Sequence, residues 1–241
     1  MNCSHSKLHA QSGFTLSEIL VALAINALVI TGALTLHQRS GQQYRFVQAA
    51  AELDERATFA LRALVADTQL AGFFHLPAGS PAAMPVAAAC NGNDRTNWAI
   101  NNANALEIAA PDALPCRTTG SAVTGSAVLI VRHLDPHSDT PVYQAHAWYV
   151  DTRSSEPGLP ALRRQTLLPD GRMQNQEIMP GVEMLQVRAV VDSDGDGLGD
   201  SLLNGPVTGA LAVVLELTVR SAGADNIRTH TVRRLVTLRN A

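Results

Sequence analysis

The chain changes abruptly from a short polar N-terminal segment to a long apolar run. Residues 19–36 are almost entirely apolar, and Asn26 is the one strongly polar side chain among them. About 18 apolar residues at 1.5 Å per residue are just enough for a helix to cross the hydrocarbon core of a bilayer. The pattern therefore predicts a membrane-spanning helix near the N-terminus.

The helical pattern continues beyond the apolar run. After His37 the sequence becomes polar, yet no proline and only Gly41 interrupts it before Gly72. We expect one helix from Phe14 to about Leu70, roughly 85 Å long at 1.5 Å per residue, which ends near Gly72. Small and apolar residues recur in its second half every three or four positions, as in an amphipathic helix. They are Val47, Ala50, Leu53, Ala57, Ala60, Leu61 and Leu64.

The rest of the chain predicts strands. Residues 77–125 are rich in Ala, Pro, Gly and Asn and predict a connecting region with one short strand at 105–110. From residue 126 short runs rich in Val, Leu and Tyr alternate with Pro, Gly and Asp. We expect strands at 127–134, 142–150, 159–167 and 182–191, and a C-terminal hairpin of 211–220 with 229–238. The fold class is α+β, a long N-terminal helix packed on a mostly antiparallel sheet.

Glu18 stands at the head of the apolar run. A charge at membrane depth costs roughly 2.5–3.5 kcal/mol on insertion scales, so this carboxylate needs a partner. Cutting the chain after Gly13 would give Phe14 a free α-amino group, four residues before Glu18 on the same helix face. The cut would therefore supply the partner.

The run Gly13-Phe14-Thr15-Leu16-Ser17-Glu18, followed by apolar residues, resembles the class III signal peptide of type IV pilins and pseudopilins. The resemblance implies that a prepilin peptidase cuts after Gly13 on the cytoplasmic face and methylates Phe14, and that Glu18 acts in assembly. Residues 1–13 are then the leader. The alternative is an ordinary signal peptide or signal anchor, with a cut site at 22–24 or 31–33.

Further segments resemble the PilW group of minor type IV pilins. They are 57–61, 67–73, 180–188, 192–197 and 233–240, and the similarity is weakest in 77–125. Members of the group often have Tyr-Gly where this chain has Ala189-Val190. Because of this difference, the loop geometry of the group does not carry over directly to the acidic loop that follows.

The resemblance implies an accessory subunit of pilus assembly rather than an enzyme. Its expected parts are a filament-core helix at 14–37, a periplasmic helix at 38–72 and a head at 73–241, in which 126–241 form the sheet. It would be anchored in the bacterial inner membrane with the head in the periplasm, and later reach the pilus. Its partners would be the prepilin peptidase, other minor and major pilins and the inner-membrane assembly machinery.

Two other functions stay open. One is a minor pseudopilin of type II secretion, which shares the leader, helix and fold. The other is a membrane-anchored periplasmic binding protein or adhesin that recognises a ligand through residues 77–125.

The composition limits the kinds of partner that the protein is expected to bind. The 241 residues carry a net charge of −3, and Lys7 is the single lysine. Removal of residues 1–13 leaves 17 Arg, from 18 Lys+Arg less Lys7, against 21 Asp+Glu, a net charge of −4. No basic tract is present, so no nucleic-acid partner is expected. Lys7, with no acidic residue near it, favours retention of the leader on the cytoplasmic side.

The cysteines predict one disulfide. Cys3 lies in the leader and would be lost with it, which leaves Cys90 and Cys116 in a chain expected to face an oxidising compartment. A bond between them would close a loop of roughly 27 residues and contribute about 3.5 kcal/mol in the loop-entropy model. The alternative is a pair of free buried thiols.

An acidic loop is the strongest candidate for a metal site. Its aspartates have the spacing of an EF-hand-type calcium loop. The proposed ligands are Asp192, Asp194, Asp196 and Asp200 at relative positions 1, 3, 5 and 9, with the backbone carbonyl of Leu198 and a glycine, Gly197, at position 6. Position 12 is Leu203 rather than glutamate, and the flanks predict strands, so weak calcium binding is expected. The alternative is a solvated Asp/Gly turn.

Other candidates for chemistry are weaker. His133, Asp135 and His137 have ligand chemistry, but Pro136 and Ser138 favour a loop between strands. Three aromatic side chains are expected to pack in the core rather than form a binding surface: Trp98, Trp148 and Tyr149. No HExxH, GxSxG, P-loop or GxGxxG motif occurs, and no nucleophile is paired with a base.

Overall fold

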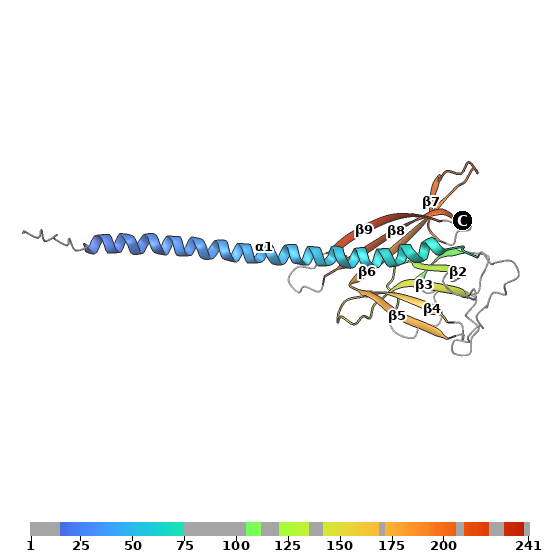
Figure 1. Cartoon of the computed structure of the whole chain (residues 1–241), viewed down its shortest axis with the longest axis horizontal. Coiled ribbons are helices and arrows are strands. Elements are labelled where there is room, and N and C mark those ends of the chain that lie inside the picture. Colours follow the sequence, from blue (N-terminus) through green and yellow to red (C-terminus); the bar gives the residue numbers. More distant parts are fainter. Residues whose placement is uncertain are drawn as a thin grey trace, which may run out of the picture. The chain divides into compact units, whose positions relative to one another are not determined.

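The computed structural model describes residues 15–74, 105–111, 121–134, 142–168, 172–205, 210–221 and 229–238. Over these residues one helix is followed by antiparallel strands in two sheets, which is the expected α+β architecture of type IV pilins (Figure 1). The chain divides into two compact units, Met1–Ala50 and Ala51–Ala241, and each is described by itself.

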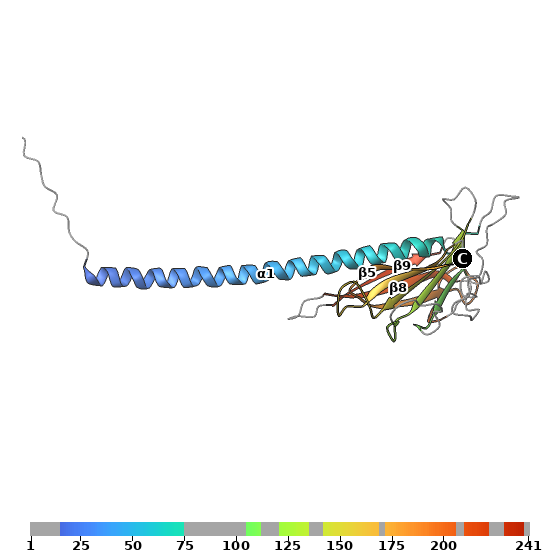
Figure 2. The ribbon, with the colours of Figure 1, turned by 90° about the horizontal axis from the view of Figure 1, so that it is seen from below.

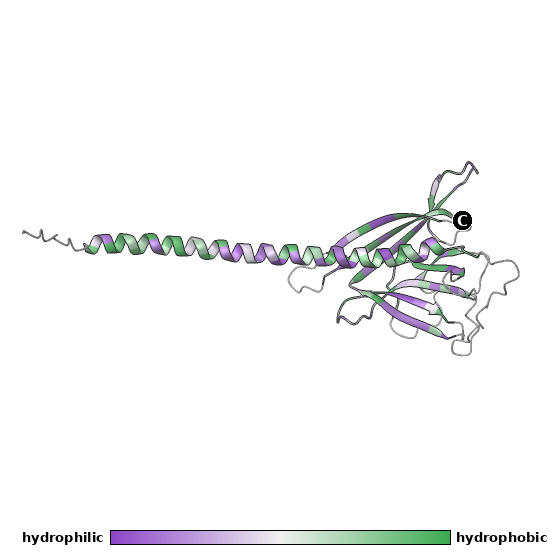
Figure 3. Cartoon of the chain, viewed as in Figure 1, coloured by the Kyte–Doolittle hydropathy of each residue, from purple (hydrophilic) through white to green (hydrophobic). Residues whose placement is uncertain are grey.

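The described part of the first unit is the N-terminal part of helix α1 (Leu16–Leu70). Up to Leu36 it is strongly apolar, in line with the hydrophobic colouring of the start of α1 in Figure 3, and its apolar side chains are exposed; Leu28 is 74% exposed. Hydroxyls in this part are satisfied within the helix, because Thr31 and Thr35 donate to the carbonyls of Ala27 and Thr31 at 2.7 Å. Among the described residues, α1 is the one helix that is long and apolar enough to cross a membrane.

The second unit contains the C-terminal part of α1, which packs on the sheets (Figure 2). Leu53, Ala57, Ala60 and Leu64 lie on one face and are buried, and two alanines among them allow the backbones to come close. The predicted stripe is therefore confirmed from Leu53 onward. It was wrong at its beginning, where Val47 and Ala50 are exposed, since burial starts only in the second unit.

The helix ends where the sequence predicts. Gly72 adopts a positive φ of 74°, a left-handed conformation that closes a helix with little strain for glycine. Its backbone N–H donates to the carbonyl of Arg132 at 3.1 Å, and the carbonyl of Phe73 accepts from Leu134 N–H at 2.7 Å. The end of the helix is thus joined directly to a strand.

The first sheet has the order β1-β2-β3-β4-β5, all antiparallel. Its strands are β1 (Leu106–Ala109), β2 (Val128–Leu134), β3 (Tyr143–Asp151), β4 (Ala161–Leu167) and β5 (Met173–Pro180). The first four agree with predicted runs within one or two residues. β5 was missed, because its polar sequence has no strand-like alternation of apolar residues.

The second sheet has the order β7-β6-β8-β9, also antiparallel. Its strands are β6 (Val182–Val191), β7 (Ser201–Leu203), β8 (Ala210–Arg220) and β9 (Thr229–Thr237). The predicted hairpin of β8 and β9 is confirmed, and β6 has its predicted bounds. β7 was missed because three residues are too few to show a period.

Gly181 connects the two sheets. Its N–H donates to the carbonyl of Pro160 at 2.8 Å, and its carbonyl accepts from Arg220 N–H at 2.7 Å. Its φ is +82°, and a Cβ atom there would lie 2.8 Å from the Arg220 carbonyl oxygen. Only glycine fits this position without strain, so the crossing between the sheets depends on it.

Candidate functional site

The start of α1 is closed by a capping box. The carboxylate of Glu18 accepts from Thr15 N–H at 2.9 Å and from the Thr15 hydroxyl at 3.0 Å, and the Glu18 N–H donates back to that hydroxyl at 3.4 Å. Glu18 therefore has a partner within its own helix in the full-length chain. The Thr-x-x-Glu spacing is the sequence signal for this box, a partner other than the amine expected for Glu18. Gly13 and Phe14 lie outside the described residues.

The acidic loop connects β6 to β7 rather than to β8. One carboxylate oxygen each from Asp192, Asp194 and Asp200 lies within 4.8 Å of the others. Asp196 is not part of this cluster, and its carboxylate instead accepts from the Leu198 N–H at 2.7 Å. The structure thus brings together three of the four aspartates proposed as calcium ligands.

Hydrogen bonds from backbone amides hold the same loop in shape. Both carboxylate oxygens of Asp192 accept backbone N–H bonds, from Gly195 at 2.6 Å and from Gly197 at 2.8 Å. These bonds, that of Gly197 first, lower the pKa of Asp192. The loop is consequently an Asx-type turn that holds its first aspartate ionised. This arrangement suits the solvated-turn alternative and also presents ionised oxygens to a cation.

The remaining sequence candidates are mostly outside the described part of the chain. Cys90 and Cys116 lie there, as do Asp135, His137 and most of residues 77–125. His133 is buried in β2 and its ring meets that of His146 edge to face, 5.4 Å between centroids. Its surroundings are those of a packed core residue.

A buried polar cluster between α1 and the first sheet was not predicted. Asp67 of α1 accepts at one carboxylate oxygen from His146 Nδ1 at 2.7 Å and from Trp148 Nε1 at 2.8 Å. Arg164 lies 3.8 Å from the same oxygen and covers the Trp148 ring at 5.6 Å from its centroid. Burial opposes ionisation of Asp67 most strongly, but His146, Arg164 and Trp148 together lower its pKa. The cluster fixes the helix to β3 and β4.

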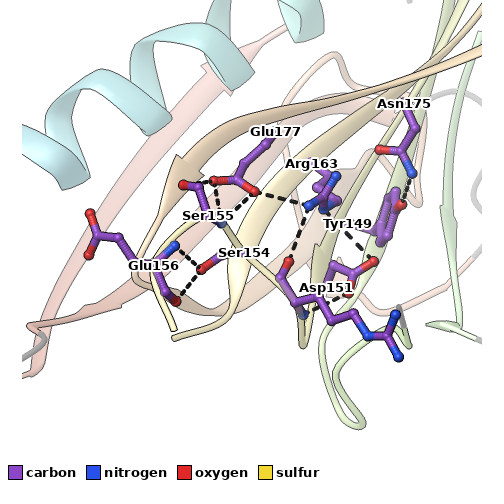
Figure 4. A network of polar contacts seen from close by, with 9 residues as sticks. Tyr149, Asp151, Ser154, Ser155, Glu156, Arg163, Asn175 and Glu177 are labelled. Carbon is purple, nitrogen blue, oxygen red and sulfur yellow. Dashed lines mark hydrogen bonds and ion pairs between the residues drawn. The ribbon is translucent and has the colours of Figure 1, made fainter. Parts of the chain in front are cut away.

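A second network lies at the turn between β3 and β4 (Figure 4). Arg163 of β4 stands between the buried Asp151 of β3, at 3.9 Å, and Glu177 of β5, at 3.0 Å. Glu177 also accepts from the hydroxyl of Ser155 in the turn. The ion pairs of Arg163 connect three strands, so this network supports the sheet.

The turn is also tied to α1. The guanidinium of Arg56 donates to both carboxylate oxygens of Glu156, at 3.1 and 2.9 Å. A two-bond contact of this kind fixes orientation as well as distance. The hydrogen bond that Arg56 donates to Glu156 is the main reason that the pKa of Arg56 is raised. Helix and sheet are therefore joined at this end by charge as well as by apolar packing.

Comparison with known proteins identifies the N-terminal segment. Residues 8–34 match the prokaryotic N-terminal methylation motif, the prepilin-type signal of type IV pilin-like proteins. No curated protein matches the chain. The matched segment contains Gly13, Phe14 and Glu18 and overlaps the apolar part of α1, which indicates membrane anchoring. The motif implies processing by a prepilin peptidase and assembly with pilus-type components, and it points to a structural protein rather than an enzyme.

Proposed function

We propose that this protein is a minor type IV pilin of the PilW kind, an accessory subunit of pilus assembly. The observation that carries the proposal is a prepilin-type signal continuous with α1, whose C-terminal part packs on antiparallel sheets. Glu18 would then belong to the filament core, and the second unit would form the head in the periplasm and later in the pilus.

The processing step gives the first test. Mass spectrometry of the mature chain should find N-methyl-Phe14 as the first residue, and Gly13→Leu should leave the leader attached because the peptidase needs a small residue before the cut. A mature chain that begins directly after residues 22–24 or 31–33 would identify an ordinary signal peptide and refute the proposal.

The second test concerns the pathway. Deletion of the gene should reduce surface pili in sheared fractions and leave secretion of folded enzymes unchanged. The reverse result would assign the protein to type II secretion as a minor pseudopilin. The two functions share leader and fold, so only this phenotype separates them.

Glu18 is proposed to pair with the Phe14 amine of a neighbouring subunit. Glu18→Ala should be cut normally but be depleted from sheared pili, because an apolar core disfavours an unpaired amine. Thr15→Ala is the matched control, since it removes the capping hydroxyl and leaves the carboxylate. Equal loss of both variants from pili would show that the helix cap matters and not the intermolecular pair.

The cysteine pair is proposed to form a disulfide in the head. Cys90 and Cys116 are the two cysteines left after the leader is removed. Alkylation of the denatured mature chain should label neither thiol before reduction and both after it. Two labels without reduction would show free thiols instead.

The acidic loop is proposed to bind calcium weakly. Full-length protein in detergent should melt at a higher temperature in millimolar calcium than in EDTA, with a smaller rise in magnesium, because binding stabilises the folded state alone. Asp194→Asn should abolish the rise, whereas Asp196→Asn, outside the carboxylate cluster, should keep it. Identical melting in calcium and EDTA would leave the loop as a solvated turn.

A further inference from the structure

An open groove lies between the two sheets of the second unit. Its volume is about 920 Å³, within the range of ligand sites. One wall is β1 with the residues that follow it, and β6 from Leu185 to Arg188 forms the other. Glu216 of β8 and Arg233 of β9 complete the lining on the second sheet. The groove is therefore bordered by strands from both sheets.

Among the described residues, the outer edge of the β1 wall is not paired with another strand. In the antiparallel ladder with β2, the Arg132 N–H donates to the carbonyl of Ala105 at 2.8 Å. Hydrogen-bonded pairs alternate along such a ladder, so Glu107 and Ala109 also bond toward β2. The backbone groups of Leu106 and Ile108 point away from β2, and β1 is the last strand of its sheet in the described part of the chain.

The β6 wall also has a short edge that is not paired with another strand among the described residues. On the side away from β8, the Leu185 carbonyl accepts from Ala127 N–H at 2.7 Å, and the Leu185 N–H donates to the Ser126 hydroxyl at 3.1 Å. Further along the same side, β7 pairs with Ala189 and its neighbours. Val187 lies between these two contacts, so its backbone groups point to the same side, next to the groove. No ladder of the described residues joins β6 to β1.

The charges of the lining do not cancel. Glu107 is matched by the buried Arg132, at 2.7 Å. Glu216 has two cations, Arg233 Nε at 2.8 Å and Arg188 at 3.9 Å. The Arg233 side chain is 62% exposed and can contact a further anion. One positive charge thus remains on the second-sheet side of the groove.

We propose that the groove binds an extended segment of a partner protein that carries a carboxylate side chain. The segment pairs through its backbone with the free edges of β1 and β6 and joins the two sheets, a strand-addition mode of recognition. Its carboxylate lies against Arg233 and Arg188. The proposal rests on the second unit alone and holds whether or not the protein is a pilin.

The experiment uses full-length protein in detergent and a fluorescent seven-residue peptide of alternating valine and threonine with a central glutamate. Fluorescence anisotropy measures binding. A peptide with lysine in place of the glutamate tests charge, and one with N-methyl groups on alternate amides tests backbone pairing. We expect the glutamate peptide to bind, and both modified peptides to bind about tenfold more weakly or worse.

Two protein variants complete the test. Arg233→Glu should reverse the preference, so that the lysine peptide binds better than the glutamate peptide. Arg234→Glu is the matched control, because it makes the same charge change one residue away on the opposite face of β9 and should behave as wild type. No binding by wild type, equal binding of the N-methylated peptide, or equal effects of the two variants would overturn the proposal.

Discussion

Replacement of Asp67 by alanine should detach the helix from the first sheet more than any surface substitution on α1. The variant removes the acceptor of two short hydrogen bonds, from His146 Nδ1 at 2.7 Å and Trp148 Nε1 at 2.8 Å. Trp148 is 1% exposed, so its indole N–H cannot turn to solvent when the carboxylate is lost.

The expected cost follows from these contacts. A buried donor left without an acceptor costs about 1–3 kcal/mol, and two are left here, so we expect Asp67→Ala to lower the free energy of unfolding by about 4 kcal/mol. Asp67→Asn keeps the shape and one acceptor oxygen and should cost about 2 kcal/mol.

The control is Asp54→Ala on the same helix. Asp54 also faces a histidine, His230 at 3.5 Å, but its side chain is 70% exposed. An exposed pair of this kind contributes less than about 1 kcal/mol. The free energies of unfolding of Asp67→Ala, Asp67→Asn and Asp54→Ala are measured by urea unfolding of the full-length protein in detergent, with near-ultraviolet circular dichroism as the signal. If Asp67→Ala were no more destabilising than Asp54→Ala, the argument from buried donors would be wrong.

The same cluster gives the sign of a pH dependence. The folded state lowers the pKa of Asp67 below its ordinary value of 3.8. A lowered carboxyl pKa adds stability above the ordinary value, and that stability is lost as the pH falls through the folded-state pKa. The difference in stability between wild type and Asp67→Asn should therefore be full near neutral pH and shrink below pH 3.8.

Three further substitutions, of which Gly158→Ala is a control, test the joins between the sheets by the same unfolding measurement. Gly181→Ala should lower the free energy of unfolding by about 3 kcal/mol, and Gly158→Ala by about 1 kcal/mol. Both glycines have a positive φ, but only at Gly181 would a Cβ atom meet backbone, the Arg220 carbonyl. Equal losses of stability would contradict this reasoning. Ser126→Ala should cost about 2 kcal/mol because it leaves the buried Leu185 N–H without its acceptor, and a neutral result would show that the contact is replaceable.

Periodic burial explains how much of the fold the sequence predicts. β6 and β8 bury alternate residues against the helix, and that alternation is visible in the sequence. β5 is an edge strand built of Gln, Asn and Glu, and it forms because the backbone of β4 offers it a partner. Pairing of backbones leaves no mark on side-chain composition, so such strands escape a pattern-based prediction.

The same distinction applies to the sites. The capping box of Thr15 and Glu18 is local, and its spacing was available in the sequence. Asp67 and His146 are 79 residues apart, and nothing near either residue indicates the other. The acidic loop falls between these cases. The spacing predicts that its aspartates converge, and the carboxylates of Asp192, Asp194 and Asp200 do lie together, whereas that of Asp196 accepts from the nearby Leu198 N–H.

The order of strands has a consequence for how the second unit folds. In the described part of the chain, each ladder joins strands that follow one another, except that β8 pairs with β6 past β7. Contacts between sequence neighbours close small loops, which favours rapid formation of both sheets. Docking of α1 closes far larger loops, so we expect it to follow the sheets on the folding pathway. Changes on the helix face should then accelerate unfolding and leave the folding rate nearly unchanged. The packing of α1 on the sheets would thus set how long the second unit stays folded rather than how fast it forms.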